Sequence, residues 1–155
     1  MLFARSTLIS VVVVFLLSAM AGYFLFQNRS AIGLGDAVEV DWRLLGEMDY
    51  VTGKMPAELQ SLDGKEVKIP GFMVPLEDNQ KAVTEFLLVP SPQACIHVPP
   101  PPPNQMVLIN MDASANAKVE FGPIWVVGKL SLKSKRHMYG ESSFQMNGFK
   151  IEPYR

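Results

Sequence analysis

The sequence predicts a mainly β domain, a small antiparallel barrel of the OB type or a sandwich, after one N-terminal transmembrane helix. Three observations predict this architecture. An uncharged apolar run lies close to the N-terminus, and several short segments further on alternate apolar and polar residues. No long helical crossover separates these segments, which argues against an α/β fold. With 155 residues, the chain has room for one domain.

The apolar run extends from Leu8 to Phe26 without a charge. As a helix it would be about 30 Å long, which matches the hydrocarbon core of a bilayer. Ala19-Met20-Ala21 has the form of a signal-peptidase site, but the apolar residues continue beyond it to Phe26. We therefore predict a retained anchor or uncleaved signal over residues 1–28. The alternative is cleavage near Ala21 and secretion to the periplasm.

Three regions follow from this interpretation. Residues 1–28 form the membrane anchor, residues 29–41 a linker, and residues 42–155 a periplasmic β-rich domain. A short N-terminal tail is expected to stay inside, which makes the chain a single-pass protein of a bacterial inner membrane. The chain has 14 Lys+Arg against 15 Asp+Glu, so it lacks the basic excess of a nucleic-acid-binding protein.

The first predicted strands lie between residues 65 and 111. One bent strand is expected over 65–74, with a bulge at Pro70-Gly71 that would bring Phe72 and Val74 to the face of Val67 and Ile69. Pro56 is suited to the first position of a helical turn over 56–61, and Asp63-Gly64 marks a turn. Two further strands are predicted over 85–89 and 105–111.

The last part of the chain predicts a strand over 124–133 and then a hairpin. Asn147-Gly148 is the strongest short hairpin signal in the sequence. If these two residues form the turn, Met146 faces Phe149 and Phe144 faces Ile151, so the apolar side chains share one face.

Cys95 and His97 are the candidate chemical residues. In an extended chain, residues two apart point to the same side. Thiolate and imidazole are good ligands for a soft divalent ion, and they are also a nucleophile and a base. His137 is the only other histidine and the candidate third metal ligand, with Glu141 as a fourth. The alternative is structural, with Cys95 simply buried.

Five prolines, Pro99, Pro100, Pro101, Pro102 and Pro103, follow this pair and precede Asn104. Such a run favours a stiff polyproline conformation, which either fixes a site or presents a ligand to an aromatic groove. We therefore treat Pro99 to Asn104 as a candidate interaction segment. No nucleophile elbow, P-loop or zinc-protease motif is present, so a non-enzymatic role is favoured and no catalytic residue is assigned.

Several blocks of the sequence are similar to one known family. They comprise residues 62–65, 67–76, 86–90, 95–105, 123–128, 139–140 and 151–154. The most specific is Cys95-Ile96-His97-Val98 with the five prolines and Asn104-Gln105. These blocks resemble domain-of-unknown-function family 3299, a family of bacterial envelope proteins. The resemblance implies an exported protein, often encoded beside ABC-type permeases and sometimes linked to zinc supply, and it points to Cys95, His97 and Asn104.

Three functions are compatible with these features. The first is a non-enzymatic accessory or binding protein of an envelope transport system of the ABC type, with the inner membrane and a permease as partners and zinc as the candidate cofactor. The second is a structural module that docks a membrane partner through the proline segment. The third is a thiol or redox protein that uses Cys95 and His97.

Overall fold

The computed structural model describes Ser18, Met20 and residues 37–77, 82–92, 100–112, 115 and 117–154. The chain divides into two compact units, Met1–Asp36 and Ala37–Arg155. Most of the predicted membrane span lies outside the described residues. No helix among the residues described is long and apolar enough to cross a bilayer.

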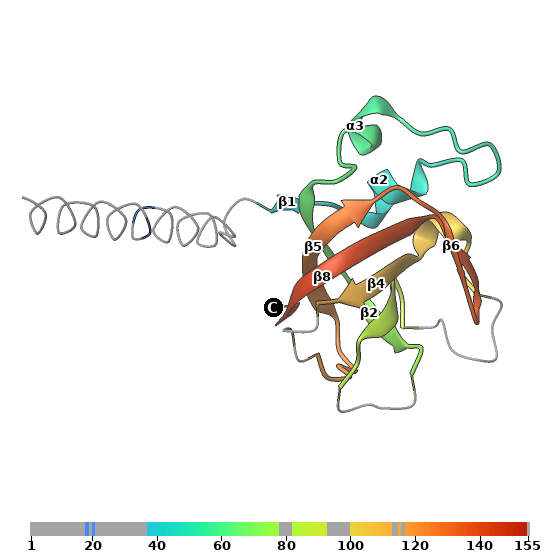
Figure 1. Cartoon of the computed structure of the whole chain (residues 1–155). Helices are drawn as coiled ribbons and strands as arrows, with labels where there is room; N and C mark the ends of the chain where they lie inside the picture. Colours follow the sequence, from blue (N-terminus) through green and yellow to red (C-terminus); the bar gives the residue numbers. More distant parts are fainter. Residues whose placement is uncertain are drawn as a thin grey trace, which may run out of the picture. The chain divides into compact units, whose positions relative to one another are not determined.

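The second unit is a mainly β domain with two short helices and one 3₁₀ turn (Figure 1). Its elements, in chain order, are β1 (Val38–Glu39), α2 (Trp42–Gly46), α3 (Ala57–Gln60), β2 (Glu66–Pro75), β3 (Glu85–Val89), η1 (Pro103–Gln105), β4 (Val107–Met111), β5 (Ile124–Ser131), β6 (Lys135–His137), β7 (Gly140–Ser142) and β8 (Phe144–Pro153). The unit begins at Ala37, and Val38 pairs with Val67. Residues 38 and 39, assigned to the linker from the sequence, are therefore a strand of the domain.

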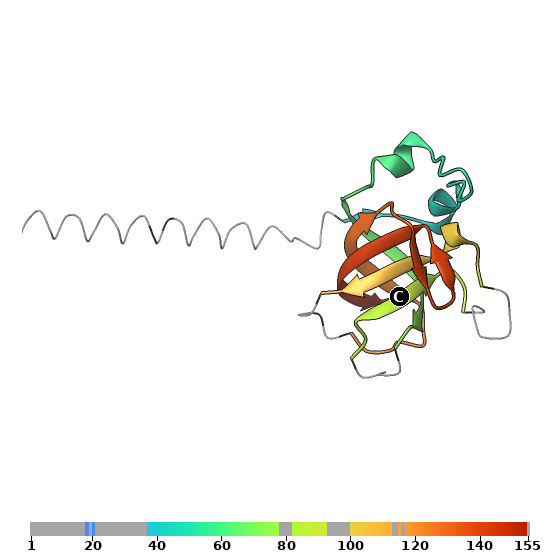
Figure 2. The same ribbon diagram turned by 45° about the vertical axis from the view of Figure 1, so that its right-hand side comes forward.

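Five strands close into a barrel. They follow one another in the order β2-β3-β4-β8-β5, and β5 pairs back with β2. Strand β8, the last in the chain, thus lies between β4 and β5 and runs parallel to β4. This order is that of an OB-type barrel, so the predicted fold class is confirmed, with one parallel pair in an otherwise antiparallel barrel. In both views α2 and α3 lie at one end of the barrel (Figures 1 and 2).

The barrel interior is filled by the inward side chains of all five strands. In β2 the inward positions alternate regularly, and Val67 and Ile69 are fully buried. Leu45 of α2 and Leu59 of α3 belong to the same core cluster and are also fully buried. The two helices therefore close one end of the barrel with apolar side chains, as a small barrel requires.

The predicted bulge at Pro70-Gly71 is wrong. Strand β2 pairs in unbroken register, first with β5 up to Gly71 and then with β3 from Phe72. Phe72 and Val74 therefore stay on the outer face, opposite to Val67 and Ile69. They pack there against a second apolar cluster that contains Leu87, Val89, Met106 and Leu108. The sequence prediction failed because it assumed that every apolar side chain belongs to one core.

The predicted hairpin at Asn147-Gly148 is also wrong, because β8 runs straight through these residues. Asn147 pairs with Lys129 on one side and with Asn110 on the other. Gly148 has no positive φ, which a two-residue hairpin turn would need. Instead the register shifts at Val127/Gly128, which makes Phe149 an extra residue and produces a β-bulge.

Candidate functional site

The structure tests only part of the predicted site. Cys95, His97 and Pro99 lie outside the described residues. Asn104 and His137 are described, as are the prolines from Pro100 to Pro103. What can be examined is therefore the barrel end to which the proline segment leads.

The proline segment reaches the barrel in an extended conformation. Pro102 has φ −61° and ψ 154°, the polyproline geometry expected from the sequence. Pro100 and Pro102 are exposed, whereas Pro101 and Pro103 are half-buried. At Pro103 the chain turns into η1 and continues into β4. The segment thus presents one side to solvent and rests its other side on the domain.

Asn104, the last residue of the predicted interaction segment, is buried. Its side chain is only 9% exposed. The Nδ2 group donates hydrogen bonds to the carbonyl oxygens of Gly46, at 3.0 Å, and Met48, at 2.9 Å. Both carbonyls lie at the C-terminal end of α2, where helix carbonyls lack partners within the helix. Asn104 therefore fastens the end of the proline segment to α2.

Gln105 adds a second connection that the sequence analysis missed. Its Nε2 atom donates to the carbonyl oxygen of Trp42 at 3.2 Å. A Cβ atom at Gly46 would lie 2.7 Å from the same Nε2 atom, so a larger residue there would displace the Gln105 amide from this position. Asn104 and Gln105 together hold the base of the proline segment on one helix. The only sequence signal was the polar Asn-Gln pair directly after five prolines.

The β6–β7 hairpin lies beside this base. The backbone N–H of Ser143 donates to the carbonyl oxygen of Pro103 at 2.9 Å, which joins the segment after β7 to η1. Ser142 and Ser143 are both buried. The hairpin carries His137, which pairs with Gly140 across the two strands. The predicted third ligand is thus on an element attached to the proline segment.

His137 has a defined tautomer in this arrangement. Its Nδ1 atom accepts the backbone N–H of Tyr139 at 3.3 Å, so in the neutral ring the proton resides on Nε2. Burial lowers the pKa of His137, and the negative charge of Glu85 opposes this effect only in part. The neutral ring is therefore favoured, with Nε2 as a hydrogen-bond donor.

Two buried polar atoms at this end have no hydrogen-bond partner in the described part of the chain. They are the Nε2 atom of His137 and the Oδ1 atom of Asn104. One is a donor and the other an acceptor. A buried polar group without a partner is costly, so each of these atoms requires a partner outside the described residues, such as water, a ligand or another segment of chain.

The metal hypothesis receives no geometric support from the described residues. No group of three or more His, Cys, Asp or Glu side chains comes together among them. Glu141 lies opposite Arg136 in the hairpin and contacts it at 3.9 Å, which leaves it outside any shared site with His137. A protonated Nε2 is also a donor and not a metal ligand, so His137 would have to change its hydrogen bond to bind an ion.

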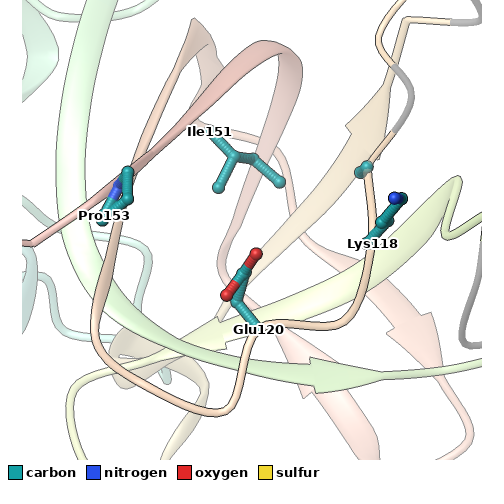
Figure 3. Close-up of a pocket in the computed structure, with 5 residues that line it drawn as sticks. Lys118, Glu120, Ile151 and Pro153 are labelled. Carbon is teal, nitrogen blue, oxygen red and sulfur yellow. The ribbon is translucent and has the colours of Figure 1, made fainter.

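A small hollow of about 170 Å³ lies elsewhere on the domain, between the end of β8 and the loop before β5. The side chain of Glu120 extends from this loop toward Ile151, and Lys118 lies on the opposite side (Figure 3). The hollow combines one carboxylate, one amine and apolar walls. It contains no nucleophile with an adjacent base, so it does not define a catalytic site.

The fold and this barrel end define a class: a small OB-type barrel with a proline segment fastened to its helical end. Residues 47–153 match a family model described as protein of unknown function (DUF3299), and the chain belongs to this family. A crystal structure of a DUF3299 family protein from Pseudomonas aeruginosa PAO1 is similar, with 31% sequence identity and a TM-score of 0.61. The similarity covers 78% of this chain and 98% of that chain. No curated protein matches the chain.

Proposed function

We propose that this chain is a non-enzymatic accessory protein of a bacterial envelope transport system, held in the inner membrane by residues 1–28 with its barrel in the periplasm. The proline segment and the adjacent hairpin form its binding end, and an ABC-type permease is its partner. The apolar run from Leu8 to Phe26 supports the location.

The observation that carries the proposal is the way Asn104 anchors the segment. A polyproline stretch loses little conformational entropy on binding, because its backbone is already restricted. Here the stretch is also held at its base by three side-chain hydrogen bonds, two from Asn104 and one from Gln105. The exposed faces of Pro100 and Pro102 are therefore presented in a fixed direction. Such presentation serves recognition better than catalysis.

A direct test uses the exposed prolines. We expect the full chain carrying Pro100→Ser and Pro102→Ser to lose co-purification with an ABC-type permease from the same cells. Neither proline is buried, so the melting temperature should change little. The matched control is Pro153→Ser, an exposed proline at the end of β8. Loss of the permease with the control, or its retention with the double variant, would reject the proposed binding end.

Zinc enters the proposal only through Cys95 and His97. Their spacing suits a soft divalent ion, whereas the hydrogen bond of His137 does not. If the pair binds zinc in the folded chain, added zinc must raise the melting temperature, and Cys95→Ser and His97→Ala must each abolish the rise. An unchanged melting temperature with micromolar zinc would remove the metal from the proposal and leave the docking role intact.

A further inference from the structure

A separate apolar groove lies away from the proline segment, on the surface where β2, β5 and the end of the chain meet. It has a volume of about 320 Å³. Its walls are aromatic rings and prolines, namely Trp42, Phe72 and Tyr154 with Pro70, Pro90 and Pro123, and Gly71 lies between them.

The groove is built by fixed contacts. The indole N–H of Trp42 donates to the carbonyl oxygen of Pro70, which ties α2 to the strand beneath it. Pro70 pairs with Trp125 across the barrel wall, and the ring of Trp125 packs on Tyr154 with centroids 5.2 Å apart. The backbone N–H of Tyr154 donates to the carbonyl oxygen of Pro123 at 3.0 Å. The aromatic rings are therefore held in place before any ligand arrives.

Two large aromatic side chains in or next to the lining segments are exposed. Tyr154, which lines the groove, is 50% exposed, and Phe121, two residues before Pro123 in the chain, is 87% exposed. Burying a phenylalanine side chain is favourable in free energy, so an exposed phenylalanine gains by contact with an apolar partner. An exposed phenylalanine and tyrosine, together with tryptophan in the groove, are the kinds of side chain that enter the boundary between lipid headgroups and acyl chains.

Two lysines near the rings are paired with carboxylates in the described part of the chain. Lys68 lies over the ring of Trp125, 4.4 Å from its centroid, and forms an ion pair with Glu39 at 3.4 Å. Lys150 is paired with Glu152. Because each lysine lies beside a carboxylate, these pairs add no net charge next to the aromatic rings. Such a surface suits a zwitterionic lipid surface better than an anionic ligand.

The short stretch of chain between the apolar run and the domain keeps the domain within reach of a bilayer. Residues 27–36, which separate the apolar run from Ala37, span at most about 35 Å when fully extended. After Ala37 the chain forms β1, which pairs with β2, and then reaches Trp42, which lines the groove. We infer that this groove and Phe121 dock on the bilayer beside the anchor, with the aromatic rings at the headgroup level. The inference rests on the membrane anchoring in the proposed function.

The two tryptophans of the chain, Trp42 and Trp125, both lie at this surface and report on docking directly. The full chain is placed in nanodiscs of phosphatidylcholine with brominated acyl chains, which quench tryptophan emission over short distances. Compared with unbrominated nanodiscs, we expect most of the tryptophan emission to be lost. Adding anionic phosphatidylglycerol or salt should not change this loss, because the local charges are paired.

Phe121→Ser should restore most of the emission, whereas the matched variant Val51→Ser should not. Val51 is 82% exposed, lies in the turn after α2 and does not line the groove. A chain that enters nanodiscs without quenching would overturn the docking inference alone, and a chain that does not enter them would overturn the anchoring. Equal quenching in Phe121→Ser, or a tryptophan response to a free peptide copying residues 99–105, would also overturn it; the latter would assign the groove to a proline segment.

Discussion

Asn104 holds two distant parts of the chain together with one amide group. Its two hydrogen bonds reach carbonyls more than fifty positions away, at the end of α2. The sequence pointed to this residue, since it follows five prolines, but not to its role. A buried anchor and an exposed recognition residue look the same in one sequence, because the partner carbonyls belong to a segment that only the fold brings near.

Replacing Asn104 by alanine should destabilise the domain. The change leaves the carbonyl oxygens of Gly46 and Met48 without their donor in a buried place, which costs about 2 kcal/mol of unfolding free energy. Urea denaturation measures the loss. Gln60→Ala is the matched control, because Gln60 donates a similar bond to Met55 but is exposed. A loss of unfolding free energy no larger than that of the control would contradict the anchoring role.

His137 should make stability depend on pH near neutrality. Burial lowers the pKa of His137 in the folded state, so between that value and the usual pKa of about 6.5 the unfolded chain binds more protons. The contribution of neutral His137 to the unfolding free energy should therefore be fully present above about pH 6.5. The unfolding free energy should fall as the pH drops below that value.

The comparison with His137→Gln isolates this contribution, because every other titratable residue is the same in both proteins. Unfolding free energies measured between pH 7.5 and 5.5 should fall more steeply for the natural chain than for the variant. Parallel curves would show that His137 titrates alike in the folded and unfolded chain.

At the scale of elements, β5 and β8 show where local sequence patterns succeed and fail. The strands over residues 85–89 and 124–131 were predictable, because their apolar residues are short runs bounded by turn residues. Asn147-Gly148 was misread as a turn. Close packing favours glycine there, since a Cβ at Gly148 would lie 2.6 Å from the Sδ atom of Met111 and would displace that side chain. That contact arises between strands far apart in the sequence, so no local pattern contains it.

Gly128 provides a sharper test of the same packing. A Cβ atom at this position would lie 2.5 Å from the backbone oxygen of Asn147, which cannot move without disturbing the bulge in β8. Gly128→Ala should therefore lower the unfolding free energy by about 3 kcal/mol. Gly122→Ala is the control, because nothing lies within 4 Å of its Cβ position. Thermal unfolding of both variants measures the difference, and equal melting temperatures would contradict the assigned strand approach.

On the scale of the whole molecule, the barrel carries two surfaces with different chemistry. One is the helical end, with the anchored prolines and the two buried polar atoms of Asn104 and His137. The other is the aromatic groove of Trp42 and Tyr154. The sequence predicted the barrel and the proline segment, whose signals are local. It did not predict the groove, whose rings come from α2, β2 and the C-terminal residues.

The proposed role requires the proline end, and no other face of the barrel, to meet the permease. A photo-crosslinking amino acid placed at the exposed position of Pro102 in the full-length chain, in intact cells, tests this most directly. The account predicts a crosslink to the permease from this position and none from Lys54, which is equally exposed on the turn after α2. Crosslinks of equal yield from both positions, or none from position 102, would contradict it.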